Sequence, residues 1–172
     1  MVCPPRLCGA KKNTPRKKIS YGAKMVEKTT RAATKAIYAE FTTRYKDAPV
    51  DFAQNCLDLD PLAWQREVML AVALGDRRLS VRSGHGVGKS TCAAAIMLWY
   101  LLTRYPCKVI TTAPTASQLY DALFAECKNL MKRLPAPIAK LLEATSDRVV
   151  LKSSPTEAFI SCRTASRDRP ES

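Results

Sequence analysis

The sequence predicts an α/β domain whose mostly parallel sheet is flanked by helices, preceded by a basic N-terminal arm and a helix. Helix-like and strand-like patterns alternate after residue 58, which is the order typical of a parallel sheet. A glycine-rich loop, residues 83–88, separates one expected strand from the helix that follows it. The 172 residues, of which 47% are hydrophobic, provide enough chain to bury one core. We therefore expect one domain together with an arm.

The chain is expected to have three parts. Residues 1–19 are rich in lysine and proline and predict a disordered basic arm, residues 20–57 an N-terminal helix and a connector, and residues 58–172 the α/β domain. The net charge of +13 favours polyanionic partners, and for the arm a solubilising tail is an equal alternative.

Within these parts, turn and capping residues mark where the expected helices and strands begin and end. A helix is expected over residues 20–46, followed by a connector to residue 60, where Asp60 is expected to cap the next helix, with Pro61 at its first position and Gly75 at its end. The further expected elements are a strand at 78–82, a buried helix at 89–104, a strand at 107–112, a helix at 117–134, a short helix at 138–144, and two strands, 148–152 and 157–163, joined by a hairpin-like turn. The crossover through residues 89–104 should be right-handed.

The cysteines and the hydropathy pattern bear on location. The seven cysteines contain no Cys-x-x-Cys pair, and the single histidine, His85, lies in the glycine-rich loop, so no zinc site is expected. We expect most of the cysteines to be reduced and buried. The longest apolar run, residues 92–102, is shorter than the ~20 residues of a membrane span, and no secretory signal is visible. A cytosolic protein without a membrane partner is expected.

The strongest motif is the glycine-rich loop. Residues 83–90 read Ser-Gly-His-Gly-Val-Gly-Lys-Ser, which is the phosphate-binding loop pattern except for Ser83 at its first position. Glycines let the backbone approach an anion closely, and the amides of about residues 86–89 would face the β-phosphate at the N-terminus of a helix. The alternative, a glycine-rich turn after an edge strand, explains neither Lys89 nor Ser90. The expected fold is therefore of the P-loop NTPase type.

Each residue type in the loop has an expected role. Lys89 is expected to reach the β- and γ-phosphates, and Ser90 to hold Mg²⁺ through its hydroxyl, with Thr91 beside it. The loop residues expected to contact the nucleotide are Gly84, His85, Gly86, Val87 and Gly88. His85 has no partner ligands, so we expect a loop side chain near the γ-phosphate.

Three segments together resemble a known family. They are Trp64-Gln65-Arg66, then Val81-Arg-Ser-Gly-His-Gly-Val-Gly-Lys-Ser90, then Thr112-Ala-Pro-Thr-Ala-Ser-Gln118. In this order they are similar to the N-terminal ATPase domain of the large terminase subunit of tailed bacteriophages, the motor that pumps DNA into a procapsid. The resemblance covers about residues 58–172.

The resemblance implies roles for residues outside the loop. In the family a glutamine ahead of the phosphate loop reads the adenine, and Gln65 matches it; the alternative is a helix-surface glutamine. Trp64 is equally a core residue or a residue that stacks on adenine. By analogy with helicase-like motors, Thr115 and Gln118 are expected to couple nucleotide to DNA. The equal alternative is that Thr115 or Ala116 merely starts the next helix. The implied cofactors are ATP and Mg²⁺.

Two departures from the family pattern affect the expected activity. Many members carry an arginine finger at the position of His85, and Arg82 or a neighbouring subunit's arginine would have to replace it. No apolar strand ends in the Asp-Glu pair that binds Mg²⁺ through water and activates the attacking water. The sequence thus resembles a fragment truncated before that strand and before the nuclease domain, with ATP bound weakly and hydrolysed little or not at all.

The expected function is the ATP-binding part of a phage DNA-packaging terminase large subunit in the cytoplasm of a bacterial host. The resemblance implies double-stranded DNA, the terminase small subunit and the portal or procapsid as partners, with oligomers only in the packaging motor. Two alternatives stay open: a helicase-like or other DNA-transaction ATPase, and a basic DNA- or partner-binding module without catalysis.

Overall fold

The computed structural model describes the backbone of residues 21–164 and the side chains of residues 32–164. The disordered arm predicted for residues 1–19 lies outside the described residues. The chain divides into two compact units, Met1–Ala33 and Thr34–Ser172, and the packing that follows belongs to the second unit.

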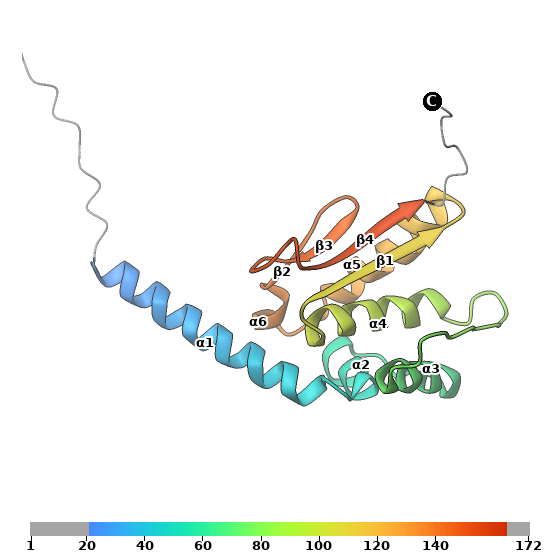
Figure 1. Cartoon of the computed structure of the whole chain (residues 1–172), viewed down its shortest axis with the longest axis horizontal. Coiled ribbons are helices and arrows are strands. Elements are labelled where there is room, and N and C mark those ends of the chain that lie inside the picture. Colours follow the sequence, from blue (N-terminus) through green and yellow to red (C-terminus); the bar gives the residue numbers. More distant parts are fainter. Residues whose placement is uncertain (1–20, 165–172) are drawn as a thin grey trace, which may run out of the picture. The chain divides into compact units, whose positions relative to one another are not determined.

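The described elements begin with four helices, continue with one strand and three helical segments, and end with three strands (Figure 1). In chain order they are α1 (Tyr21–Tyr45), α2 (Pro49–Leu57), α3 (Ala63–Leu74), α4 (Lys89–Thr103), β1 (Cys107–Ala113), the π-helix η1 (Gln118–Phe124), α5 (Ala125–Met131), α6 (Ala136–Ala139), β2 (Leu142–Ala144), β3 (Arg148–Leu151) and β4 (Ala158–Thr164). The predicted α/β class is confirmed. Among the described helices, none combines the length and apolar character needed to cross a membrane.

The sheet is mixed, so the prediction of a mostly parallel sheet was wrong. Its strand order is β1-β4-β3-β2. Strands β1 and β4 run parallel, whereas β4 with β3 and β3 with β2 are antiparallel. The turns that join β2 to β3 and β3 to β4 are short, and such turns can only return the chain antiparallel. Figure 1 shows β4 lying between β1 and β3.

One face of the sheet packs against helices and forms the core. The residues of β1 and β4 that point to this face include the register pairs Cys107 with Ala158 and Val109 with Ile160. Helices α4 and η1 contact both strands, and α5 packs on α4. Helix α4 is buried over most of its surface, as its apolar run predicted, and Trp99 is its largest buried side chain.

Aromatic residues join the C-terminal half of α1 to α2 and α4. The rings of Phe41, Tyr45 and Phe52 lie about 5 to 6 Å apart between centroids in tilted and edge-on arrangements. The Trp99 indole donates a hydrogen bond to the Tyr45 carbonyl at 2.7 Å, and the Tyr38 hydroxyl donates to the Leu102 carbonyl at 3.0 Å. These bonds satisfy polar groups at a largely apolar contact.

Two predictions about irregular segments were wrong. Residues 78–82 form no strand and are exposed, because no described strand pairs with them. The predicted connector, 47–60, instead contains α2, whose buried side chains, among them Phe52, Cys56 and Leu57, recur at helical spacing. That spacing was present in the sequence, and Pro49 at the first helical position agrees with it.

Element boundaries also required correction. Helix α3 begins at Ala63 rather than at Pro61, and Asp60 forms an ion pair with Arg66 at 2.6 Å instead of capping the helix. Residues 142–144 are a strand paired with β3, not the end of a helix. The predicted helix at 117–134 is present, but its first part, Gln118–Phe124, is a π-helix. The end of α3 at Gly75, the helix α4, β1 and the hairpin strands β3 and β4 agree with the predictions.

Candidate functional site

The glycine-rich loop leads directly into the first turn of α4. Gly86 and Gly88 have φ angles of 73° and 80°, a conformation that glycine adopts without strain. The first intrahelical bond of α4 runs from the Cys92 amide to the Gly88 carbonyl at 3.0 Å. The amides before Cys92 therefore have no carbonyl partner within the helix, and they lie at the positive end of its dipole. The loop can hold an anion.

The lysine of the loop folds over the loop backbone. The Lys89 ammonium lies 3.5 Å from the Ser83 carbonyl oxygen and also donates to the Gly84 carbonyl. Residues 83–86 are exposed, as are Lys89 and Ser90. The predicted phosphate-binding residues thus lie together at the surface, where a solvated anion could reach them.

Gln65 is buried against this loop, with both ends of its amide bonded to backbone atoms. Its Oε1 accepts from the Leu62 amide at 2.8 Å, and its Nε2 donates to the Gly88 carbonyl at 3.0 Å. The residue is only 8% exposed. A surface glutamine, the alternative to the adenine-reading role, is therefore excluded. The two bonds fix the amide's orientation and leave it one N–H and one lone pair.

A cavity adjoins the loop on the side of α3. Its volume is about 290 Å³, and its walls come from the segment before α3, from α3 itself, and from the loop and first turn of α4. The lining residues that matter most are Leu59, Pro61, Gln65, Val87 and Thr91. The cavity has mainly apolar walls with a few polar groups, the composition typical of small-molecule sites.

The side chains of Thr91 and Cys92, in the first turn of α4, have different surroundings. The Thr91 hydroxyl donates to the Glu126 carboxylate at 2.9 Å, so its single proton is already used. Burial raises the pKa of the Cys92 thiol to about 11, which keeps the thiol protonated near neutral pH and excludes it as a nucleophile there.

The other residues singled out by sequence lie outside the cavity. Trp64 packs partly buried against the core and does not line the cavity, which favours its core role over stacking on adenine. The Thr115 hydroxyl accepts from the Gln118 amide at 3.3 Å, a local bond that supports the alternative in which Thr115 starts the next helix. Arg82 and His85 are exposed.

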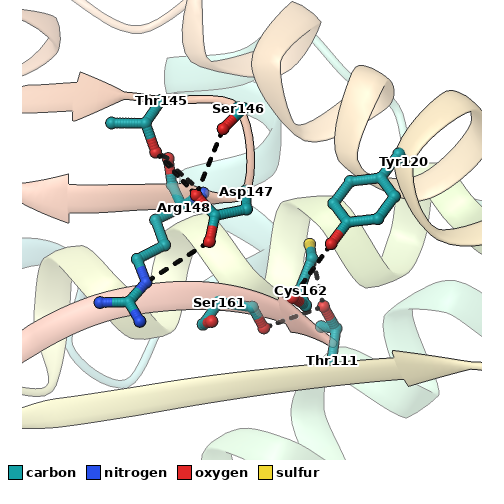
Figure 2. A network of polar contacts seen from close by, with 8 residues as sticks. All are labelled: Thr111, Tyr120, Thr145, Ser146, Asp147, Arg148, Ser161 and Cys162. Carbon is teal, nitrogen blue, oxygen red and sulfur yellow. Dashed lines mark hydrogen bonds and ion pairs between the residues drawn. The ribbon is translucent and has the colours of Figure 1, made fainter. Parts of the chain in front are cut away.

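A second polar network lies near the carboxyl ends of β1 and β4. Figure 2 shows Thr111 of β1 pointing to β4, where its hydroxyl lies 3.3 Å from both the Ser161 carbonyl oxygen and the Cys162 sulfur. The Tyr120 hydroxyl of η1 donates to the Cys162 carbonyl at 3.4 Å. The Thr111 contacts join β1 to β4, and the Tyr120 bond attaches η1 to the sheet. The last residues of β4 are Cys162, Arg163 and Thr164, so this strand ends without a carboxylate.

Sequence reasoning missed two parts of this site. The contact between Thr91 and Glu126 joins residues 35 apart in the chain, and no local pattern signals it. The bond from the Leu62 amide to Gln65 is the half of a capping box that the glutamine supplies, and it had no full sequence signal because the N-cap residue is leucine rather than Ser, Thr, Asp or Asn.

Comparison with known proteins adds nothing to this geometry. No family model, no curated protein and no solved structure matches the chain.

Proposed function

We propose that this chain binds ATP with Mg²⁺ at the loop of residues 83–90, as the nucleotide-binding part of a DNA-packaging motor of the terminase large-subunit type. The observation that carries the proposal is the loop itself. Two glycines with positive φ bring the chain into the N-terminus of α4, beside a cavity of about 290 Å³. An anion site next to a mostly apolar cavity suits a ligand that has phosphates at one end and a ring at the other.

The loop residues divide the phosphate and metal roles. The amides of about residues 86–89 hold the phosphates at the helix N-terminus. Lys89 leaves the Ser83 and Gly84 carbonyls for a phosphate oxygen, because an anion is the better partner for an ammonium group. Ser90, which is exposed at the same end of α4, would hold Mg²⁺ through its hydroxyl, and the ion would supply positive charge beside the phosphates.

Gln65 gives the site its preference for adenine. The amide is held by the Leu62 amide and the Gly88 carbonyl, and it lines the cavity with one donor and one acceptor still available. An adenine edge offers a complementary acceptor and donor. A fixed amide discriminates between bases better than a rotating one, because the wrong base would leave buried polar atoms unpaired.

In the intact motor, nucleotide hydrolysis would drive double-stranded DNA into a procapsid, with a small terminase subunit and a portal as partners and a separate nuclease domain cutting the DNA. For this chain we propose weak ATP binding and little or no turnover. The support is the sequence itself: none of its apolar strands ends in an Asp-Glu pair that could activate a water molecule.

The first test is a titration with fluorescent ATP in the presence of Mg²⁺. Lys89→Ala should weaken binding at least tenfold, the cost of losing one charge-assisted bond of about 1.5–3 kcal/mol. Lys132→Ala, which removes an exposed lysine outside the loop, is the matched control and should leave the affinity unchanged. Unlabelled ATP should displace the probe better than GTP. Equal affinities of Lys89→Ala and wild type would refute the phosphate-loop assignment, and turnover comparable with that of intact motors would refute the proposed lack of hydrolysis.

A further inference from the structure

On the face of the sheet opposite the core, the strand registers place side chains that are mostly exposed or half-buried, and we call it the uncovered face. Ser161, at 2% exposure, is the buried exception among the described residues of this face. Side chains alternate along each strand, so Lys108, Ile110 and Thr112 of β1 point away from the helices. Lys108 and Thr112 are exposed, and Ile110 is 46% exposed, unusual for a large apolar residue in a sheet. These three residues therefore present both apolar and polar groups to solvent.

Phe159 lies at the centre of this face. It pairs with Lys108 of β1 on one side and with Val150 of β3 on the other. Two cations lie near its ring: the Lys108 ammonium is 5.9 Å from the ring centroid and the Arg148 guanidinium carbon is 5.5 Å from it. The ring therefore lies half-buried between a lysine and an arginine.

The charges on the face are predominantly positive. Three cations, Lys108, Arg148 and Arg163, are spread over β1, β3 and β4, and Glu143 on β2 is the carboxylate that the register places on the same face. Asp147 approaches Arg148 at 3.7 Å, but both side chains are 48% exposed, so solvent weakens this pair. In Figure 2 Arg148 extends beside the strand that carries Ser161.

We propose that this uncovered face binds single-stranded nucleic acid. The cations offer positive charge to a phosphate backbone that crosses the strands, and Phe159 offers a ring on which a base can stack. Phosphates contact Lys108, Arg148 and Arg163, and the long exposed cationic side chains move aside from the ring when a base arrives. This site is separate from the phosphate loop and does not depend on nucleotide binding.

The charge part is tested with a labelled oligodeoxythymidine and the full chain, without nucleotide, at rising salt. The triple variant Lys108→Gln, Arg148→Gln, Arg163→Gln should bind at least tenfold more weakly, and its salt slope should fall by about two, since each phosphate contact on a single strand contributes about 0.7. The control triple variant Lys35→Gln, Lys46→Gln, Lys132→Gln changes the net charge equally but lies outside the sheet. Equal losses in both triple variants would overturn the proposal.

The stacking part is tested with Phe159→Leu, which keeps an apolar side chain and all charges. Its affinity for the single strand should fall about tenfold, and its affinity for a duplex of the same sequence should not change, because paired bases are not available for stacking. An oligouridine arm tests whether the ribose hydroxyl matters. Duplex binding that equals single-strand binding, with no effect of Phe159→Leu on either, would overturn the proposal.

A measurement on the wild-type chain keeps the proposal falsifiable if the variants fold poorly. Photo-cross-linking to an oligonucleotide that carries iodouracil, followed by peptide mapping, should modify the β4 peptide that contains Phe159. Cross-links confined to the peptides of the phosphate loop or of the N-terminal region would overturn it.

Discussion

Gln65, on the first turn of α3, connects two parts of the candidate site. Its amide joins the start of α3 to Gly88, the residue that precedes α4, through two backbone hydrogen bonds. A residue that only read a base would leave the stability of the ligand-free chain unaffected. The observed bonds give Gln65 a structural role as well, and the two roles can be separated by experiment.

At this scale we predict that Gln65→Ala destabilises the ligand-free chain. The change leaves the Leu62 amide without its partner and removes one of the two bonds to the Gly88 carbonyl, which keeps its bond from the Cys92 amide. Each lost hydrogen bond costs about 0.5–1.5 kcal/mol. Denaturant unfolding followed by circular dichroism measures the loss.

The matched control for this change is Gln54→Ala. Gln54 is exposed on α2, with a bond to Asp60 at 3.3 Å, and its removal should change the free energy of unfolding by less than about 0.5 kcal/mol. If the two variants are equally stable, the structural role of Gln65 is wrong.

At the scale of elements, the junction between the glycine-rich loop and α4 sets the position of the backbone amides at the candidate anion site. Helix α4 is anchored by its buried side chains, with Trp99 at 1% exposure, while the loop before it is exposed. The buried side chains of α4 and the bond from Gln65 to Gly88 hold the N-terminal amides of the helix in position. The positive φ of Gly88 is what permits the turn into the helix.

At this junction, the stability costs of two glycine substitutions separate the effect of backbone strain from that of a side-chain clash. Gly86→Ala and Gly88→Ala each place a side chain at positive φ, which costs about 1–3 kcal/mol. A Cβ on Gly86 would meet nothing within 4 Å, whereas one on Gly88 would lie 2.8 Å from the Gln65 Nε2 atom. Gly88→Ala should therefore be the more destabilising in thermal unfolding.

A double-mutant cycle isolates the contact. In a Gln65→Ala background the excess cost of Gly88→Ala over Gly86→Ala should shrink, because the clashing atom has been removed. An excess that persists without Gln65 would show that the contact does not matter.

At the scale of the whole molecule, the core contains titratable thiols. Five cysteines among the described residues are buried and reduced, as predicted: Cys56, Cys92, Cys107, Cys127 and Cys162. Burial raises the pKa of the Cys127 thiol from 9.0 to about 12, and that of Cys92 to about 11. Folding therefore holds these protons more tightly than the unfolded chain does.

This linkage predicts that stability falls at alkaline pH. The thiols contribute fully below pH 9.0, and the contribution is lost as pH rises from 9.0 through the folded values of about 11 and 12, because only the unfolded chain ionises in that window. The measurement is the free energy of unfolding in denaturant at neutral and at alkaline pH.

Because other groups also titrate at alkaline pH, the pH dependence of the wild type is compared with that of Cys127→Ala, which lacks one of these thiols. This variant should be less stable at neutral pH because of the lost packing, yet its stability should fall less steeply between pH 9.0 and about 12. Parallel pH curves for the variant and the wild type would contradict the prediction.

Local patterns in the sequence determined the α/β class, the phosphate-loop pattern at residues 83–90, the apolar helix α4 and the strands β1, β3 and β4. These elements follow from hydrophobic periodicity and from the backbone freedom of glycine, which act over a few residues. For the same reason Lys89 and Ser90 were found at the start of α4.

Only the tertiary structure decided which strands pair and which helices and loops contact one another. Residues 78–82 have the side chains of a strand, but no strand in the described part of the chain pairs with them. Strand β2, which the sequence did not predict, adds a further antiparallel pairing to the described sheet. The contacts of Gln65 with Gly88 and of Thr91 with Glu126, and the uncovered sheet face around Phe159, join residues far apart in the chain. Such contacts depend on how elements pack, which local periodicity does not encode.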